Sequence, residues 1–258
     1  HLVVERDGDA VVARTDLGRG TRVVVAGHLD TVPVAANLPS RREGDLIYGR
    51  GTCEMKGGVA GRLAAAAELS APRHDVTWIF YDNEEVEAVK NGLGRLARTR
   101  PDLLAGDFAV LMEPTGARIE GGCQGTLRFE VTTTGTAAHS ARSWLGHNAI
   151  HDAGALLRTL SDYTPRTVEV EGLEYREGLN AVGITGGIAG NVIPDRCAIT
   201  VNFRFAPDRS IEDAKAHCVE VFAGHELVFT DESPAARPGL DRPAAAEFLA
   251  AVGGEPRA

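Results

Sequence analysis

The alternation of short apolar segments with helical patterns most constrains how the first half of this chain can fold. Apolar segments typical of buried strands occupy residues 23–26, 76–81 and 108–112, and helical patterns occupy residues 55–69 and 92–97. Strands that alternate with helices in this way form a sheet with helices packed against it. We therefore expect an α/β domain whose sheet is mixed and largely parallel.

The middle of the chain has a different order of elements. The sequence predicts strand, helix, strand, strand, helix and strand, at residues 126–133, 147–160, 181–188, 197–205, 211–222 and 226–230. This order matches a ferredoxin-like split βαβ unit of the α+β class. We expect that unit to be inserted into the α/β domain, which gives the segments 1–123, 124–232 and 233–258.

Composition excludes several classes of protein. The formal net charge of −9 disfavours a basic nucleic-acid-binding surface, and no apolar run approaches the roughly 18 residues of a membrane span. No segment has the pattern of a secretory signal, so we expect a cytoplasmic protein without nucleic-acid or membrane partners. The chain starts without methionine and ends soon after a helical pattern at 243–252, so we expect a piece of a longer chain.

Acidic and imidazole side chains follow each predicted strand of the α/β domain. They are His28 and Asp30 after the first strand, Glu84 and Glu85 after the second, Glu113 after the third, and Glu54 in a glycine-rich loop before a helix. Each one alone is also typical of a turn or a helix cap. Because ligands bind beyond the carboxyl ends of strands in such sheets, we expect the side chains to converge there. One imidazole with several carboxylates suits a divalent metal ion.

The spacing of these residues also indicates which of them could bind a metal ion and which could act as a general base. Asp30 lies two positions after His28 and could orient its imidazole, as carboxylates commonly do for metal-bound histidines. Glu84 and Glu85 are neighbours, so one could bind a metal ion while the other faces a water molecule. That arrangement would place a general base beside a metal-activated nucleophile.

The motifs that contain these residues resemble those of the M20 family of di-zinc amidohydrolases and peptidases. The resemblance in the α/β domain rests on 28–30, 49–58, 81–85 and 113–114. The lid, or dimerisation, domain of that family is resembled by residues 135–140, 191–194 and 202–205. Within the family, the actinobacterial-type succinyl-diaminopimelate desuccinylases are most similar in the runs 121–126 and 139–150. The resemblance covers nearly the whole chain in motif order.

For the metal centre, the resemblance implies two zinc ions per subunit, with cobalt as a possible substitute. His28 and Glu113 would hold one ion, Glu85 would hold the other, and Glu54 would bridge them, with Glu84 as the general base and acid. The family has aspartate at the bridging position, so the longer Glu54 could displace the ions. The family also takes a last ligand from a histidine after the lid; no histidine follows His225, so we expect the second site to be incomplete.

For the lid, the resemblance implies a homodimer formed through this domain. His139 of the partner subunit would stabilise the oxyanion, Asn191 would assist it, and Arg204 would bind a substrate carboxylate. Without the family context, His139 is more typical of a surface loop and Arg204 of an ion pair on a strand.

The function implied is hydrolysis of N-succinyl-LL-2,6-diaminopimelate, a small molecule, to succinate and LL-2,6-diaminopimelate in lysine and cell-wall precursor biosynthesis. Two alternatives stay open. One is an acetylornithine deacetylase or aminoacylase, which differs in the acyl pocket. The other is a truncated or non-catalytic relative that keeps only the fold and the dimer surface.

Overall fold

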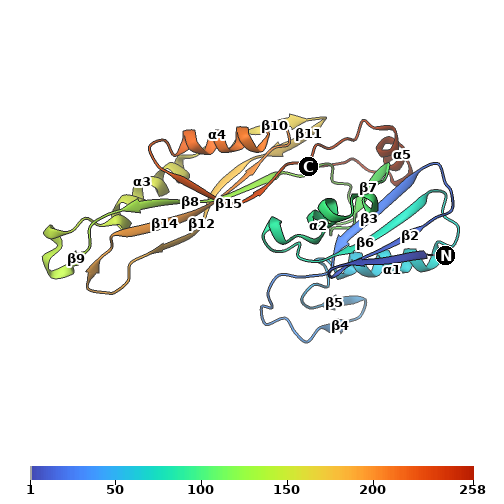
Figure 1. Ribbon diagram of the computed structural model, residues 1–258, viewed down its shortest axis with the longest axis horizontal. Helices are drawn as coiled ribbons and strands as arrows, with labels where there is room; N and C mark the ends of the chain where they lie inside the picture. Colours follow the sequence, from blue (N-terminus) through green and yellow to red (C-terminus); the bar gives the residue numbers. More distant parts are fainter. Residues whose placement is uncertain (1) are drawn as a thin grey trace. The chain divides into compact units, whose positions relative to one another are not determined.

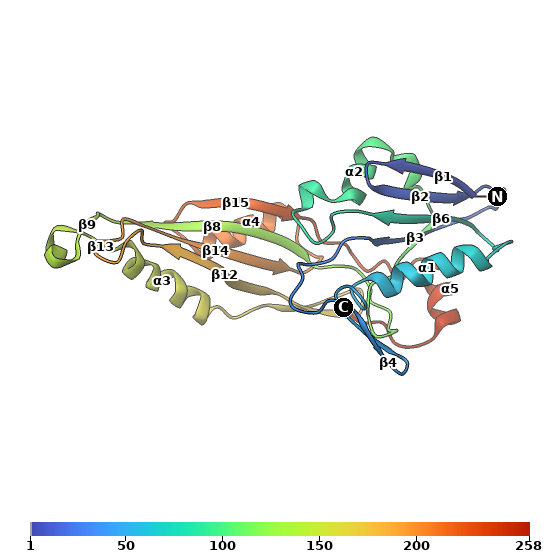
Figure 2. The same cartoon turned by 90° about the horizontal axis from the view of Figure 1, so that it is seen from below.

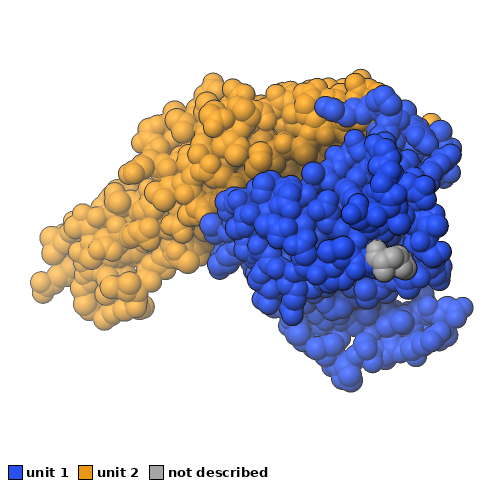
Figure 3. Space-filling model, turned by 45° about the vertical axis from the view of Figure 1, so that its right-hand side comes forward, with its two compact units in different colours: residues 1–119, 242–254 blue, residues 120–241, 255–258 orange. Residues whose placement is uncertain are grey.

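The computed structural model describes residues 2–258 and divides into two compact units (Figure 3). Unit 1 comprises the chain up to residue 119 together with 242–254, and unit 2 comprises 120–241 and 255–258. The divisions fall after residues 119 and 241, where the sequence places them after 123 and 232. None of the helices in residues 2–258 combines the length and apolar character needed to cross a membrane.

Unit 1 contains a mixed sheet with the strand order β1-β2-β6-β3-β7 (Figures 1 and 2). The strands are β1 (Leu2–Asp7), β2 (Ala10–Thr15), β3 (Arg22–His28), β6 (Asp75–Tyr81) and β7 (Phe108–Leu111). β3 pairs in parallel with β6 and β7, whereas β1–β2 and β2–β6 are antiparallel. The mixed sheet is confirmed, but its parallel part is limited to three strands. The reason is that the N-terminal hairpin adds two antiparallel strands at one side.

Helices cover both faces of this sheet. They are α1 (Lys56–Glu68), α2 (Gly92–Thr99) and α5 (Pro243–Val252), with short 3-10 helices at Ala88–Lys90 and Pro101–Leu103. α1 lies on the face of Trp78 and Phe80, where Val59 and Ala65 pack. α2 lies on the other face, where Leu96 packs in a cluster with Val24 and Ala26. The apolar segments of the sequence therefore fill two layers of core.

Unit 2 is built on an antiparallel sheet with the strand order β12-β14-β8-β15 (Figure 2). Its main elements are β8 (Gly125–Thr134), α3 (Ala149–Asp162), β12 (Gly178–Gly186), β14 (Arg196–Phe205), α4 (Ile211–Val221) and β15 (Leu227–Ser233). The order along the chain and across the sheet is that of a split βαβ unit. Leu156 of α3 and Cys218 of α4 join one core cluster with Phe129 of β8, so both helices cover the same face.

Several elements were not predicted from the sequence, and all are short. They are the hairpin β4 (Arg41–Glu43) and β5 (Leu46–Tyr48), the hairpin β10 (Thr167–Val170) and β11 (Leu173–Arg176), the paired strands β9 (Ala138–His139) and β13 (Val192–Ile193), and a 3-10 helix at Ser140–Leu145. α3 begins two residues later than predicted. The Asn148 side chain caps it by accepting from the N–H groups of Ile150 and His151.

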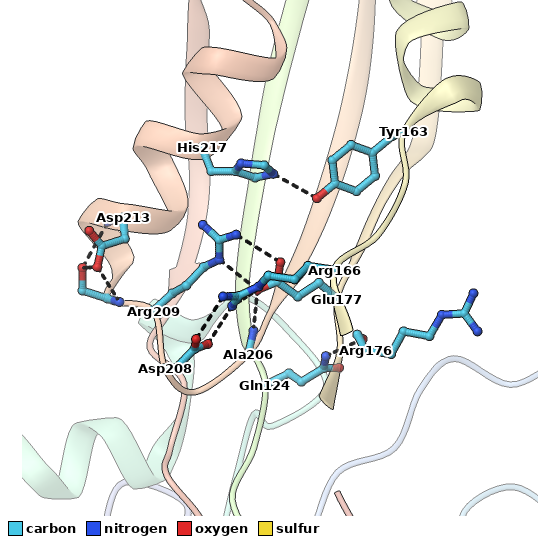
Figure 4. A network of polar contacts seen from close by, with 11 residues as sticks. Gln124, Tyr163, Arg166, Arg176, Glu177, Ala206, Asp208, Arg209, Asp213 and His217 are labelled. Atoms are coloured by element: carbon cyan, nitrogen blue, oxygen red, sulfur yellow. Dashed lines mark hydrogen bonds and ion pairs between the residues drawn. The ribbon is translucent and has the colours of Figure 1, made fainter. Parts of the chain in front are cut away.

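A buried carboxylate joins three segments of unit 2 (Figure 4). The Glu177 side chain is fully buried, and its Oε1 accepts from Arg166 (2.7 Å), Arg209 (2.9 Å) and the Ala206 N–H (3.1 Å). Arg166 also donates to both carboxylate oxygens of Asp208. Burial alone would raise the pKa of Glu177, but these hydrogen bonds outweigh it and lower the pKa. Glu177 is therefore held ionised between two guanidinium groups.

Glu177→Gln is expected to lower the free energy of unfolding by about 2 kcal/mol or more at pH 7, because Arg209 loses its counter-charge and Arg166 keeps only Asp208. Glu177 has a lowered pKa in the folded state, so its contribution is complete above the unfolded value of about 4.3 and is lost as the pH falls through the folded value. Urea unfolding at pH 7 and at acid pH measures both effects. The exposed Glu174→Gln on β11 is the matched control and should change stability by less than about 0.5 kcal/mol. An equal effect of the two substitutions would contradict this account.

Candidate metal centre

The parallel pairing of β3, β6 and β7 brings their carboxyl ends to one edge of the sheet. His28 at the end of β3 is in register with Tyr81 at the end of β6, and Ala26 is in register with Leu111 of β7. Two backbone hydrogen bonds extend the pairing beyond the strands, from Leu29 N to the Tyr81 carbonyl (2.8 Å) and from Met112 N to the Ala26 carbonyl (3.1 Å). The segments that follow β3, β6 and β7 therefore begin at the same edge of the sheet.

His28 is buried, with 1% of its side chain exposed, and its two ring nitrogens face different groups. Nδ1 lies 3.1 Å from the backbone carbonyl of Asp30. Nε2 lies 2.8 Å from Oε1 of Glu54 and 3.9 Å from Oε2 of Glu113. A carbonyl that accepts from Nδ1 sets the ring so that Nε2 faces the carboxylates, as in metal-binding histidines.

His28, Glu54 and Glu85 form the tightest group of potential ligands. Each of the three offers one ligand atom, and these atoms all lie within 4.8 Å of one another. Glu113 adjoins this group on the side of His28 and Glu54. An imidazole and carboxylate oxygens at these separations form a donor set that suits a divalent ion such as zinc. The donor set therefore fits the ion that the sequence predicts.

Asp30 has a contact that was not predicted from the sequence. Its carboxylate oxygens accept from the backbone N–H groups of Glu84 and Glu85, both at 3.1 Å. Its backbone carbonyl accepts from the His28 ring, whereas its carboxylate lies 3.4 Å from Nδ1. Asp30 therefore holds the loop after β6 as well as orienting the imidazole.

A second set of charged contacts fixes the start of the same loop. Arg95 on α2 donates to both oxygens of the Asp82 carboxylate (3.1 and 2.6 Å) and to Asp7 on β1 (2.7 Å). Gly92 packs so closely that a Cβ there would lie 2.5 Å from an Asp82 oxygen. Only glycine fits such an approach without a shift. Asp82, Arg95 and Gly92 were not predicted from the sequence as residues that support the site.

The electrostatics of this edge reflect crowded negative charge. Burial and the nearby charge of Glu54 raise the pKa of Glu113. Burial also raises the pKa of Glu84. Burial favours neutral His28, but the hydrogen bond to Glu54 and the charge of Glu113 outweigh it and raise its pKa. Such shifts are expected where like charges converge, and a bound cation would relieve the repulsion.

The remaining predicted residues lie in unit 2 and are not all brought together. His139 pairs with Val192, and the Ser140 N–H donates to the Asn191 carbonyl (2.9 Å), so His139 and Asn191 are neighbours. Arg204 lies opposite Thr126 of β8, at the other end of β14 from the pair of Arg196 and Thr134. The strand between Arg196 and Arg204 spans roughly 25 Å. Arg204 is therefore remote from His139 within one chain.

The sequence is closely similar to two actinobacterial proteins. It is 55% identical over 255 residues to DapE of Mycobacterium tuberculosis, for which succinyl-diaminopimelate desuccinylase activity is proposed; the match covers 98% of this chain and 72% of that protein. It is 46% identical over 260 residues to the succinyl-diaminopimelate desuccinylase of Corynebacterium glutamicum, covering 98% of this chain and 70% of that enzyme. The chain thus spans about 70% of the length of both relatives.

The fold is shared with solved structures. A tripeptidase from Staphylococcus aureus superposes with a TM-score of 0.73 at 19% identity, covering 98% of this chain and 73% of that one. Bacillus subtilis YxeP, described as a dinuclear metal-binding peptidase of the M20 family, gives 0.64 at 17% identity, covering 99% of this chain and 71% of that one. Residues 24–253 match the sequence pattern of peptidase family M20/M25/M40. The chain therefore belongs to peptidase family M20/M25/M40.

Proposed function

We propose that this chain is a metal-dependent amide hydrolase that cleaves N-succinyl-LL-2,6-diaminopimelate to succinate and LL-2,6-diaminopimelate, a step in lysine and cell-wall precursor biosynthesis. The convergence of His28, Glu54 and Glu85 at the carboxyl edge of the sheet carries this proposal. The names of both similar actinobacterial proteins favour this substrate over the acyl groups of an acetylornithine deacetylase or aminoacylase. A non-catalytic relative would have no reason to keep this cluster of ionisable groups.

The proposed ligands divide between two positions. His28 and Glu113 would hold one zinc ion, Glu85 would hold the other, and Glu54 would be shared between them, with cobalt as a possible substitute. The direct contacts of Glu54 with His28 and Glu113 support the central position of Glu54. When bound, the metal supplies Lewis acidity, which polarises the amide carbonyl and acidifies water.

Glu84 is the proposed general base and acid. It adjoins the proposed ligand Glu85 in the sequence, and burial raises the pKa of its carboxyl group, as suits a residue that exchanges a proton. It takes a proton from the attacking water and returns it to the amine that leaves. Asp30 holds the backbone of Glu84 and Glu85 in place through its two hydrogen bonds, which orients both side chains.

His139 is proposed to stabilise the oxyanion. Its Nδ1 accepts a hydrogen bond from the Ala141 N–H (3.1 Å), so in the neutral ring the proton is on Nε2. Nε2–H is then a donor suited to a developing negative charge, and the neighbouring Asn191 assists it. Because the side chain of His139 is exposed, it is available to a substrate.

Arg204 is proposed to bind a substrate carboxylate. It is exposed and forms no ion pair within residues 2–258, whereas Arg128 and Arg196 of the same sheet lie near Asp231 and Glu130. Nη1 of Arg204 donates to the Thr126 hydroxyl, and a guanidinium without a counter-charge presents donors that match a carboxylate. Since Arg204 and His139 are remote within one chain, we propose that His139 of the partner subunit completes the site.

The proposed homodimer forms through unit 2, the proposed lid. β12 is an edge strand of the sheet and carries exposed Val182 and Ile184, with exposed Ile188 just beyond it. Open strand edges with apolar side chains favour pairing with another chain. This edge is therefore the proposed contact between the two copies.

Glu84→Gln is expected to lower kcat by about 10²–10⁴-fold while leaving metal content unchanged, because the amide cannot accept the proton and the residue is not a ligand. Hydrolysis assays and elemental analysis of the dialysed protein measure the two quantities. Glu68→Gln, at the exposed end of α1, is the matched control and should leave both unchanged. Loss of metal from Glu84→Gln would exchange the roles of Glu84 and Glu85.

The substrate is tested by comparing initial rates on N-succinyl-LL-2,6-diaminopimelate and N-acetylornithine. The succinyl substrate is expected to give the higher kcat/KM. Arg204→Met should raise its KM by about tenfold or more, since a charge-assisted hydrogen bond is lost. Arg196→Met removes the same charge from the far end of β14 and should leave KM within twofold. A preference for N-acetylornithine would favour the deacetylase alternative instead.

Glu54→Asp is expected to raise the affinity for the second metal ion and the turnover together. The long Glu54 side chain reaches the nitrogen of His28 that would bind an ion, and a shorter bridging carboxylate leaves that nitrogen free. Zinc titration of the apoprotein and steady-state rates give the two quantities. Changes within about twofold in both would show that the flanking loop already accommodates glutamate.

A further inference from the structure

Arg62, on α1, is a buried arginine without a hydrogen-bond partner. The residue is 0% exposed, and its Nε, Nη1 and Nη2 atoms are all buried and unbonded within residues 2–258. The other largely buried guanidinium groups described above, Arg95 and Arg209, donate to carboxylates. Burying a charge without a partner costs several kcal/mol of folding free energy, so a buried unpaired arginine requires a physical explanation.

The guanidinium packs against the strand that ends in the proposed ligand His28. A Cβ on Gly27 would lie 1.5 Å from Nη1 of Arg62, so the group packs against the backbone next to His28. On its other side, the guanidinium carbon lies 4.9 Å from the centre of the Phe80 ring. Gly27 is therefore the residue whose missing side chain leaves room for Arg62, and it immediately precedes the proposed ligand.

The charge of Arg62 interacts with that of Glu113, one of the proposed ligands. Burial lowers the pKa of Arg62, and the charge of Glu113 works in the opposite direction. A guanidinium does not lose its proton at neutral pH, so the positive charge remains fixed. The carboxylates of Glu54, Glu84, Glu85 and Glu113 present excess negative charge at the same edge of the sheet. Attraction to this negative charge offsets part of the cost of burying the Arg62 guanidinium, which no hydrogen bond offsets.

We propose that Arg62 is a fixed internal cation that balances the carboxylates of the metal centre when no ion is bound and weakens the binding of divalent ions there. This inference rests on the metal centre of the proposed function. Like charges repel across a protein interior more strongly than in water, so Arg62 opposes an incoming cation. The same charge lowers the repulsion among the carboxylates of the apoprotein. Arg62 thus sets metal affinity without touching the metal.

The test is zinc affinity, measured by competition with a chromophoric chelator, in Arg62→Met and Arg62→Gln. Both variants remove the charge, and both are expected to bind zinc at least about tenfold more tightly than the unchanged protein. Their melting temperature should also rise more on addition of zinc, because the apoprotein loses its internal counter-charge. Arg98→Met removes the same charge from the exposed face of α2 and should leave zinc affinity within twofold. Arg62→Lys keeps a charge and serves to separate the effects of charge and shape.

The sign of the change distinguishes this role from a purely structural one. If Arg62 only supported the fold, Arg62→Met would disturb the ligands and weaken zinc binding. Weakened or unchanged zinc binding in both uncharged variants therefore overturns the proposal. Failure of both variants to fold in the presence of zinc also overturns it, because the bound ion should then balance the charge of the carboxylates. If the unchanged protein binds no zinc, or if His28→Ala leaves its zinc binding intact, the proposed function itself fails.

Discussion

The parallel register of β3 with β6 and β7 is the constraint on which the candidate centre depends. It sets His28 level with Tyr81, so the loop that carries Glu84 and Glu85 starts beside the imidazole. Hydrogen bonds in a parallel pair are evenly spaced, and a slip by one residue would turn every side chain to the other face. His28 would then leave the edge where the carboxylates gather. The same pairing that buries the core of unit 1 therefore also assembles the proposed ligands.

Bringing carboxylates together creates an electrostatic problem that the fold addresses locally. Two backbone N–H groups satisfy Asp30, and the His28 ring donates to Glu54. Burial and the charge of Glu54 raise the pKa of Glu113, and the positive charge of Arg62 opposes that rise. Full ionisation of the cluster therefore favours a cation.

The sequence was sufficient to predict the strands and long helices because their apolar patterns extend over many residues. β4, β5, β10 and β11 have too few residues for an alternating pattern to be recognised. The ionisable residues at strand ends could be named in advance because parallel strands end at one edge. Their bonding could not, since the contacts of Asp30 join backbone groups 54 and 55 positions away.

Arg62 shows a second limit of prediction from sequence. An arginine in an alanine-rich helix is typical of a solvent-exposed position, and only the packing of α1 on Gly27 places it in the interior. Whether a charge is buried depends on which face of a helix meets the sheet and on what the facing residue lacks. Neither is local in the chain. The residues that tune a site electrostatically are therefore harder to find from sequence than those that touch its ligands.

The arrangement of unit 2 links the proposed chemistry to assembly. β14 separates Arg204 from the segment of His139 and Asn191 by a length of regular strand, and a hydrogen-bonded strand does not shorten. A site that uses both groups on one small substrate therefore draws them from two copies of the chain. If so, turnover per subunit depends on protein concentration near the dissociation constant of the dimer, whereas metal binding at His28 does not. Catalysis and metal binding, although they share ligands, would then respond separately to dilution.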